Sequence, residues 1–475
     1  MSFDFERKQR IAIIGGGPGG FEAALAGALL GAEVTLIEST GVGGSAVLTD
    51  VVPSKTLIAT ADAARAIGDA SELGVQFYAK GENGKPLKPE TAINLLAVNK
   101  RILALAGQQS EDMREQLIDA GVTIISGHGR LEGDSAVVVS TGPGGTDFDR
   151  IEADTFVLSV GASPRELPSA KPDGDRILTW KQLYDLPAVP EHLIVVGSGV
   201  TGAEFASAYM NLGSQVTLVS SREQVLPGED PDAAKVLEKV FKRGGMKLLS
   251  KSRADKVENT GSGVIVTLSD GSTVEGSHCL MAVGSVPNTK DIGLESAGVQ
   301  LAESGHILVN KVGRTSVPNI YAVGDCTNLV PLASVASMLG RTAVFHAMGD
   351  AVIPFSERKI ASNIFTSPEI ATVGWTSPEG AVEYKIPLEA NPRAKMMGVK
   401  DGFVKLFARD VSGTIIGGVV VAPKASELIF PIAIAVDRRL TVDQVARVFA
   451  AYPSLTTSVA DAARAMHGIN QRGVF

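Results

Sequence analysis

The chain has 475 residues, enough for about three domains, and its 44% hydrophobic and 20% charged content is ordinary for a soluble globular protein. The net charge of −8 argues against nonspecific nucleic-acid binding, and apolar runs such as 428–436 are too short for a transmembrane segment. The N-terminus lacks the apolar core of a signal peptide. Cys279 and Cys326 lie in different regions and fit a reduced, cytoplasmic compartment. The six histidines are scattered without ligand spacing, so no metal site is expected.

The first predicted element is an apolar strand that leads into a glycine-rich turn. Residues 15–20 read GGGPGG and match G-x-G-x-x-G, with an alanine-rich helix after them. Glycines permit the tight turn and let backbone N–H groups approach a pyrophosphate. Glu38 ends the next strand, where a carboxylate accepts the ribose hydroxyls of an adenosine. We therefore expect a dinucleotide to contact Gly15, Gly17, Pro18, Gly20 and Glu38.

The same unit recurs later in the chain, because residues 193–220 repeat the pattern of residues 11–38. Its turn carries Gly197, Gly199 and Gly202. Ser220 stands where the first copy has its glutamate, and Ser221 and Arg222 follow. Serines and a guanidinium accept a 2′-phosphate that a carboxylate would repel, which favours NADPH over strict use of NADH. The alternative is that Arg222 is a solvated surface residue.

Other segments predict further elements. Residues 43–55 favour a helix, short β-prone runs fill 122–161, and 279–283 and 319–323 are expected strands. The pattern changes after about residue 352, where 402–423 predicts a hairpin that turns at Ser412 and Gly413. We expect two helices after it, the second beginning near Thr441 with Asp443 in its first turn. This region is predicted to be a separate α+β domain.

The motifs together resemble the flavoprotein disulfide reductases, typified by dihydrolipoamide dehydrogenase. Residues 43–55 read GGSAVLTDVVPSK, where that family has GGTCLNVGCIPSK. Residues 159–164 are similar to its interdomain hinge, 321–325 to its second FAD motif, and the likeness continues through 365–374 to the C-terminus. The resemblance implies an α/β fold with two Rossmann-like dinucleotide-binding domains and a C-terminal α+β dimerisation domain. The implied ranges are 1–158 and 286–351 for FAD, 159–285 for NAD(P), and 352–475 for dimerisation.

The resemblance also implies site residues beyond the two glycine turns. They are Gly44, Ser45, Lys55, Gly161, Asp325 and Ala333 for FAD, and Glu204 and Gly284 for the nucleotide site. In the family, the lysine and glutamate at positions 55 and 204 meet beside flavin N5, where a cation favours the electron-rich reduced ring. The alternative is an ordinary interdomain ion pair. Glu22, the repeat mate of Glu204, is expected to be a solvated helix residue.

The departures from the family are equally informative. Ala46 and Val51 occupy the positions of the redox cysteines, and Tyr452 and Thr457 replace the catalytic histidine and its glutamate. A phenol that titrates near ~10 is a poor base at neutral pH. The nucleophiles and their acid–base partner are thus missing together. This excludes dihydrolipoamide oxidation, glutathione reduction and mercuric-ion reduction by the family's route.

The remaining parts suffice for NAD(P)H to reduce FAD and for the electrons to pass to a quinone. The chain resembles the cysteine-less actinobacterial branch of the family, which acts as NAD(P)H:quinone reductase, and Tyr452 and Thr457 match that branch. The alternatives are a pyridine-nucleotide transhydrogenase or diaphorase, and a flavin-binding redox sensor without turnover. We expect Lys55, Glu204 and Tyr452 to be catalytic and the protein to be a homodimer or a dimer of dimers. The resemblance further implies a cis Tyr452–Pro453 bond and a tyrosine that reaches the partner's flavin pocket or merely fills space.

Overall fold

The computed structural model describes residues 7–78, 91–142, 147–375 and 380–470. They form two compact units, one built from ranges within 1–54, 100–165 and 284–356, the other from ranges within 55–99, 166–283 and 357–475. Helices α3 (Val51–Asp69) and α4 (Leu95–Asp119) each contribute residues to both units. No helix in the described ranges has the length and apolar character that a bilayer crossing requires.

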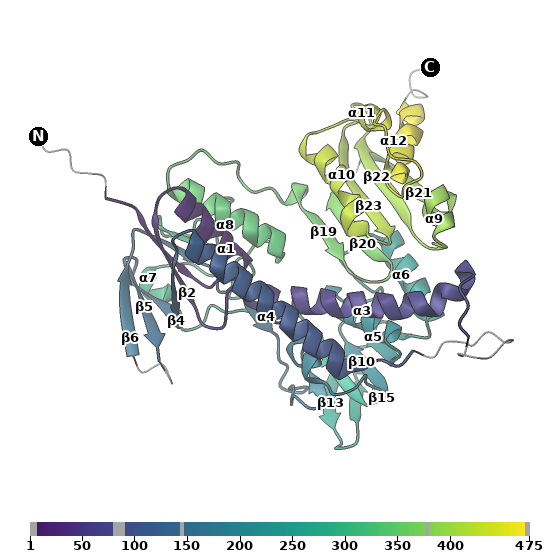
Figure 1. Cartoon of the computed structure of the whole chain (residues 1–475), viewed down its shortest axis with the longest axis horizontal. Coiled ribbons are helices and arrows are strands. Elements are labelled where there is room, and N and C mark those ends of the chain that lie inside the picture. The colour runs from purple at the N-terminus through teal and green to yellow at the C-terminus, as the bar shows by residue number, and fades with distance from the viewer. Residues whose placement is uncertain (1–6, 79–90, 143–146, 376–379, 471–475) are drawn as a thin grey trace, which may run out of the picture. The chain divides into compact units, whose positions relative to one another are not determined.

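The first unit is built on a five-stranded parallel sheet (Figure 1). Its order is β18 (Ile320–Ala322), β7 (Thr155–Leu158), β1 (Arg10–Ile14), β2 (Glu33–Glu38) and β3 (Thr123–Ser126). Helices α1 (Pro18–Leu29) and α8 (Ala333–Ala347) lie side by side and share one apolar core with this sheet. A Cβ on Gly340 would stand 2.1 Å from the carbonyl oxygen of Gly19, so glycine permits this close approach.

A second apolar core lies between that parallel sheet and a small antiparallel sheet. The small sheet consists of β4 (His128–Glu132), β5 (Ala136–Thr141) and β6 (Asp147–Glu152), and α7 (Leu294–Ala297) packs against it. Strands β8 (Ala162–Pro164) and β17 (Ser285–Pro287) pair as a separate antiparallel ribbon. The short helix α2 (Gly44–Leu48) precedes α3, so the predicted helical stretch 43–55 is confirmed with a break at Thr49 and Asp50.

The second unit repeats the parallel βαβ plan. Its sheet has the order β12 (Lys247–Leu249), β11 (Gln215–Val219), β10 (His192–Val196), β16 (His278–Met281) and β9 (Ile177–Leu178). Helix α5 (Val200–Asn211) joins β10 to β11, as the internal repeat predicts, and α6 (Pro231–Arg243) follows β11 beyond the repeat. An antiparallel sheet of β13 (Ala254–Asn259), β14 (Val264–Leu268) and β15 (Thr273–Gly276) shares a core with β9, β10 and β16.

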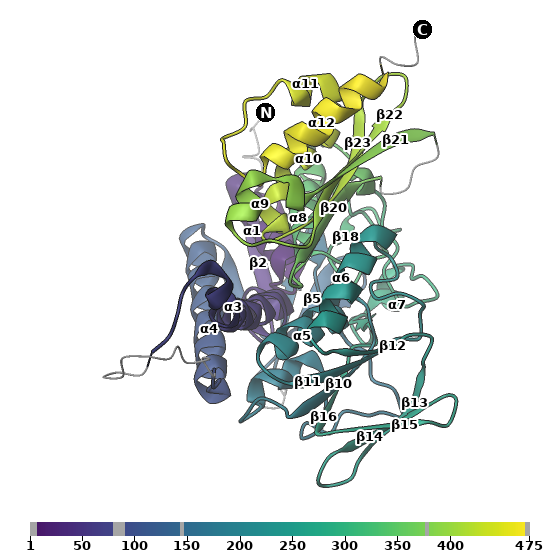
Figure 2. The ribbon, with the colours of Figure 1, turned by 90° about the vertical axis from the view of Figure 1, so that its right-hand side faces the viewer.

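The C-terminal part of this unit is an antiparallel sheet with helices, as predicted. The sheet has the order β19 (Ala361–Ile364), β20 (Glu369–Gly374), β23 (Ile415–Ala422), β22 (Phe403–Arg409) and β21 (Ala381–Pro387). Helix α10 (Ala425–Asp437) packs on β20 and β23, and α12 (Thr457–Asn470) packs on β21 and β22 (Figure 2). The short helices α9 (Pro392–Met396) and α11 (Val442–Ala446) complete it.

Several predicted details of this region are confirmed, and one is wrong. The β22–β23 hairpin turns where the sequence predicts it, and α11 begins after Thr441, whose hydroxyl accepts the N–H of Gln444 at 3.3 Å. The expectation of two helices after the hairpin is wrong, because α12 is a third. Its inward residues include Val459, Ala463 and Met466, an apolar spacing typical of a helix that covers a sheet.

Candidate functional site

The first glycine turn joins β1 to α1 in the way that dinucleotide binding requires. Gly15 has a φ of +98°, and a Cβ there would meet the Ser159 carbonyl oxygen at 2.3 Å. A Cβ on Gly20 would stand 1.9 Å from the Gly15 carbonyl oxygen. Helix α1 begins after Gly17 with Pro18 in its first turn, and no side chain of the described residues caps it. The N–H groups of this first turn are therefore available to a phosphate group.

Glu38 folds back onto this turn. Its Oε2 accepts the Gly16 N–H at 2.6 Å, and its Oε1 accepts the N–H and hydroxyl of Thr40 at 2.7 and 2.9 Å. These bonds fix the carboxylate at the carboxyl end of β2, next to the N-terminus of α1. Its Oε1 also accepts the Gly41 N–H at 3.2 Å, and a ribose hydroxyl can take the place of the Thr40 hydroxyl, which is free to rotate away. The position and surroundings of Glu38 therefore fit the role that the sequence predicts.

Helix α2 begins beside the same turn. The Gly43 N–H donates to the Gly16 carbonyl oxygen at 2.7 Å, and a Cβ on Gly44 would lie 3.0 Å from the Gly17 Cα. Ser45 is exposed, whereas Ala46 is half-buried. The two predicted segments, 15–20 and 44–45, are thus adjacent within the first unit.

The other predicted cofactor residues of this unit lie on separate segments. Gly161 and Gly284 precede β8 and β17, with φ values of +65° and +93°, and the Arg165 N–H donates to the Gly284 carbonyl oxygen at 2.9 Å. Burial raises the pKa of Asp325, although nearby His306 acts in the opposite direction. Ala333 is the first residue of α8. Partial burial beside a strand end is a suitable place for a carboxylate that binds hydroxyl groups.

The second glycine turn, in the other unit, repeats the first one closely. Gly197 has a φ of +112°, and a Cβ on Gly202 would stand 1.8 Å from the Gly197 carbonyl oxygen. Helix α5 begins after Gly199, again without a side-chain cap from the described residues. The difference lies at the strand end, where the Ser220 hydroxyl contacts the Ser198 hydroxyl at 2.7 Å. Ser198 was not among the predicted site residues.

Ser221 and Arg222 follow on the surface. Both are exposed, and the Arg222 N–H donates to the Ser220 hydroxyl at 3.1 Å. The main chain of Arg222 is also held through its carbonyl oxygen, which accepts the Lys251 N–H at 2.9 Å. A guanidinium on a fixed backbone beside a glycine turn is well placed to bind an anion.

Lys55 and Glu204 form an ion pair within the second unit. The Lys55 Nζ lies 2.8 Å from the Glu204 Oε2, with side chains 27% and 4% exposed. The Glu204 Oε1 accepts the Phe365 N–H at 2.8 Å, and the Lys55 Nζ lies 4.9 Å from the centroid of the Phe365 ring. The backbone of residue 365 is a contributor that the sequence analysis missed, since a main-chain donor leaves no compositional signal. One carboxylate oxygen of Glu204 thus contacts Lys55 and the other is held by the backbone, which fixes the rotation of the carboxylate.

Tyr452 differs from Lys55 and Glu204 in its exposure to solvent. Its side chain is largely exposed, and its bond to Pro453 is cis, as predicted. Thr457, at the start of α12, donates its hydroxyl to the Ser454 carbonyl oxygen, which also accepts the Asn391 amide at 3.0 Å. Residues 454–457 thus form a locally bonded turn, and the threonine at the family's glutamate position stabilises that turn.

The structure also bears on the predictions for Glu22, for the two cysteines and for a metal site. Glu22 is not simply solvated, because its carboxylate pairs with Arg341 at 3.2 Å. Cys279 and Cys326 are buried free thiols, and burial raises the pKa of Cys326 to about 11. Such thiols are poor nucleophiles at neutral pH. Within the described ranges, no cluster of three or more histidine, cysteine, aspartate or glutamate residues is arranged to hold a metal ion.

Comparison with known proteins decides the family. Residues 9–340 match the family described as pyridine nucleotide-disulphide oxidoreductase, and residues 360–463 match its dimerisation domain. The chain belongs to this family. It is 49% identical over 471 residues to the Mycobacterium tuberculosis protein named NAD(P)H dehydrogenase (quinone), with 96% of this chain and 93% of that protein covered. It is 31% identical to dihydrolipoyl dehydrogenase 2 of Haloarcula marismortui, with 96% of each covered.

A solved structure gives the same result. The crystal structure of LpdA from Mycobacterium tuberculosis superposes with a TM-score of 0.89 at 48% identity, covering 96% of this chain and 99% of that one. The predicted α/β class with a C-terminal dimerisation domain is confirmed. Membership in the pyridine nucleotide-disulphide oxidoreductase family implies binding of FAD and of a pyridine nucleotide. Helices α1 and α5 each begin at a glycine turn without a side-chain cap from the described residues. The first turn is suited to the pyrophosphate of FAD and the second to that of the pyridine nucleotide.

Proposed function

We propose that this protein is a flavin-dependent NAD(P)H:quinone oxidoreductase that works without a redox disulfide. The reaction converts NAD(P)H, a proton and a quinone into NAD(P)⁺ and the hydroquinone. The observation that carries the proposal is that the chain keeps the family's ion pair and lacks its thiol and histidine groups. The Lys55–Glu204 pair is retained, whereas Ala46, Val51 and Tyr452 stand in place of the two cysteines and the histidine.

The assigned residues fall into two sets that match the two glycine turns. For FAD they are Gly15, Gly17, Pro18, Gly20, Glu38, Gly44, Ser45, Lys55, Gly161, Asp325 and Ala333. For the pyridine nucleotide they are Gly197, Gly199, Gly202, Glu204, Ser220, Ser221, Arg222 and Gly284. When bound, FAD supplies the redox chemistry, taking a hydride equivalent from NAD(P)H and passing two electrons to the acceptor.

In this proposal the protein contributes a positive charge at the flavin and the groups that hold it in position. We assign the Lys55 ammonium to the flavin ring, where a positive charge stabilises the negative charge that accompanies reduction. Glu204 holds that ammonium in place, and the Phe365 N–H in turn orients Glu204. Small apolar side chains at positions 46 and 51 supply no nucleophile, so the electrons leave for a diffusible acceptor. The name of the Mycobacterium tuberculosis relative supports a quinone as that acceptor.

We further propose NADPH as the preferred donor, on the basis of Ser220, Ser221 and Arg222, with NADH also accepted. The domain limits that we assign are 1–158 and 286–351 for FAD, 159–285 for NAD(P), and 352–475 for dimerisation. The family's dimerisation domain supports a homodimer or a dimer of dimers. The buried free thiols support a cytoplasmic location.

An anaerobic titration combined with an acceptor assay tests the function. With NADPH as donor, a soluble naphthoquinone should be reduced at least about tenfold faster than NAD⁺ or lipoamide. Reduction of lipoamide in particular requires a dithiol on the enzyme, which this chain lacks at positions 46 and 51. The FAD-loaded protein should take up two electrons per flavin without a thiolate charge-transfer band. Uptake of four electrons, or rapid turnover of lipoamide, would contradict the proposal. Faster reduction of NAD⁺ than of quinone would identify a transhydrogenase instead.

A further inference from the structure

Lys405 is a lysine whose ammonium is buried in the sheet of the C-terminal region. It lies on β22, and its side chain is only 5% exposed. Its Nζ contacts the Asp230 Oδ2 at 2.7 Å and the Asp232 Oδ2 at 2.9 Å. A buried ammonium group is stable only when carboxylates neutralise its charge. The buried Asp230 carboxylate likewise needs a cation beside it. The three side chains therefore depend on one another.

Asp230 also controls where α6 begins. Its Oδ1 accepts the N–H groups of Asp232 and Ala233 at 2.9 and 3.1 Å, so it caps the helix. Its other oxygen is held by Lys405. One carboxylate thus joins the first turn of α6 to strand β22, and its rotation is fixed from both sides.

The segment before α6 carries the proposed nucleotide residues. Residues 220–230 lead from the end of β11 through Ser220 and Arg222 to Asp230. The segment is held at its start by the Ser198–Ser220 contact and at its middle by the Leu226 N–H, which donates to the Ser198 carbonyl oxygen at 2.8 Å. Lys405 holds its far end. The second glycine turn and the buried lysine thus hold the two ends of this segment, while the Lys251 N–H and the Glu238 carboxylate hold Arg222 and Val225 between them.

A neighbouring lysine provides a contrast. Lys385 contacts Asp232 at 2.9 Å, but its side chain is 45% exposed and no contact with Asp230 is present among the described residues. Hydrogen bonds from Lys405 and then Lys385 lower the pKa of Asp232 to about 2, although burial opposes them. The aspartate thus stays ionised at neutral pH with either lysine present. Only Lys405 reaches the capping carboxylate.

We propose that Lys405 is a positioning residue for the pyridine nucleotide, which acts by anchoring residues 220–230 through Asp230. The inference rests on the proposed binding of NAD(P)H at the second glycine turn. Because this anchor holds the end of the segment at which α6 begins, it supports the adenosine half that NADPH and NADH share. It touches neither the nucleotide nor the flavin, so its effect falls on affinity and not on hydride transfer.

Calorimetric titration of the FAD-loaded protein with NADP⁺ and NAD⁺ tests this without requiring turnover. Lys405→Met leaves the buried Asp230 without its cation and Asp232 with Lys385 alone, and we expect Kd to rise about tenfold for both nucleotides. The limiting rate of FAD reduction at saturating NADPH should stay within about twofold of the parent value. Lys385→Met is the matched control and should leave both Kd values unchanged. A parent protein that binds nucleotide but reduces no quinone would refute the proposed function and leave this inference standing.

Several outcomes would overturn the inference. Unchanged Kd values in a folded Lys405→Met protein would show that Lys405 contributes only to stability and not to nucleotide binding. A rise confined to NADP⁺ would indicate a change of local charge instead of lost positioning. If Lys405→Met does not fold, Asp230→Asn carries the test, because asparagine still caps a helix. That variant should raise both Kd values severalfold, and parent-like affinity would contradict the proposal.

Discussion

Lys55 and Glu204 meet in the second unit and, in our proposal, act at the flavin, so the removal of Lys55 should separate binding from reduction. Lys55→Met leaves the Glu204 carboxylate buried without its cation. We expect the limiting rate of FAD reduction by NADPH to fall about 10- to 100-fold, with a more negative flavin potential. Stopped-flow reduction and a potentiometric titration measure both. Lys359→Met, which removes an exposed pair with Asp437, is the control and should behave like the parent.

Arg222 is the residue on which nucleotide preference depends in our proposal. Arg222→Ala removes a charge-assisted contact to a 2′-phosphate, so KM for NADPH should rise about tenfold while KM for NADH stays nearly constant. Steady-state assays with both donors measure this. Lys251→Ala is the matched control, since its ammonium pairs with Glu223 at 3.0 Å on the same exposed surface. Equal changes for both donors in the Arg222 variant would show that the guanidinium is only a surface charge.

Tyr452 is exposed in the single chain, which leaves its phenol and its ring free to contact a second copy or a substrate. If the phenol positions the quinone, Tyr452→Phe and Tyr452→Ala should both slow quinone reduction, whereas NADPH should still reduce FAD at the parent rate. If the ring alone matters, only the alanine variant should be slower. Parent-like turnover in both variants would remove Tyr452 from the site.

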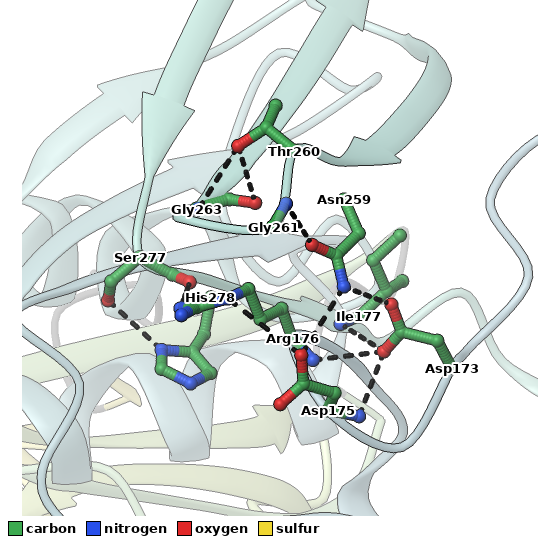
Figure 3. Close-up of polar contacts among 10 residues, drawn as sticks. All are labelled: Asp173, Asp175, Arg176, Ile177, Asn259, Thr260, Gly261, Gly263, Ser277 and His278. Carbon is green, nitrogen blue, oxygen red and sulfur yellow. Dashed lines mark hydrogen bonds and ion pairs between the residues drawn. The ribbon is translucent and has the colours of Figure 1, made fainter.

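At the level of elements, the segment that leads into β9 is organised by one aspartate. The Asp173 Oδ1 accepts the N–H groups of Asp175, Arg176 and Ile177, each at 2.9 Å, and its Oδ2 accepts the Asn259 amide at 2.8 Å (Figure 3). Desolvation acts to raise the pKa of Asp173, but these hydrogen bonds outweigh it and lower the pKa to about 2. The carboxylate thus orders a turn and ties it to the end of β13.

Asp173→Ala should therefore destabilise the protein by roughly 1 to 2 kcal/mol at pH 7, because several bonds to one exposed carboxylate are lost. A lowered pKa in the folded state means that this stabilisation is complete above the ordinary pKa of 3.8 and disappears as the pH falls through about 2. Thermal unfolding at pH 7, 5 and 3 should show the same difference between parent and variant at pH 7 and 5 and a smaller difference at pH 3, between the two pKa values. Asp175→Ala is the control, because its side chain is 74% exposed. A difference that grows on acidification would contradict this account.

The elements that the sequence predicted well are those with a local signal. Both βαβ units follow from glycine spacing and apolar strands, and the β22–β23 hairpin follows from alternation around a Ser-Gly turn. The long helix α4 and the terminal helix α12 were not predicted, although both carry apolar residues at helical spacing, because neither begins at a glycine turn of the repeated unit. Lys405 could not be predicted as buried, since a lysine between apolar strand residues normally faces water. Only the tertiary position of Asp230 explains it.

For the whole molecule, the surface of α10 predicts self-association. Ile429 and Ile432 are buried, whereas Phe430 is 65% and Ile434 43% exposed on the same helix. Phe449 is fully exposed on the loop before α12. Large apolar side chains left in water in this way mark an interface, and the family's dimerisation domain includes them.

Phe430→Glu should weaken that association at least about tenfold, because it places a charge in an apolar contact. Sedimentation velocity over a range of concentrations should show the parent as a dimer or larger and the variant shifted to smaller species. The fold should survive, since residue 430 is exposed within the chain. Val411→Glu, at a fully exposed position of the β22–β23 turn, is the matched control. A parent protein that sediments as a monomer at every concentration would refute the dimer proposal.

The two glycine turns differ at a pair of positions that contact each other in both copies. In the first copy, a Cβ at residue 16 would stand 3.1 Å from the Glu38 carboxylate, so glycine there makes room for the acid. In the second copy, Ser198 has a side chain and Ser220 is short, and the two hydroxyls meet. A glutamate at residue 220 would enter space that Ser198 already fills. In our proposal, a change of donor preference at this turn therefore requires residues 198 and 220 to change together.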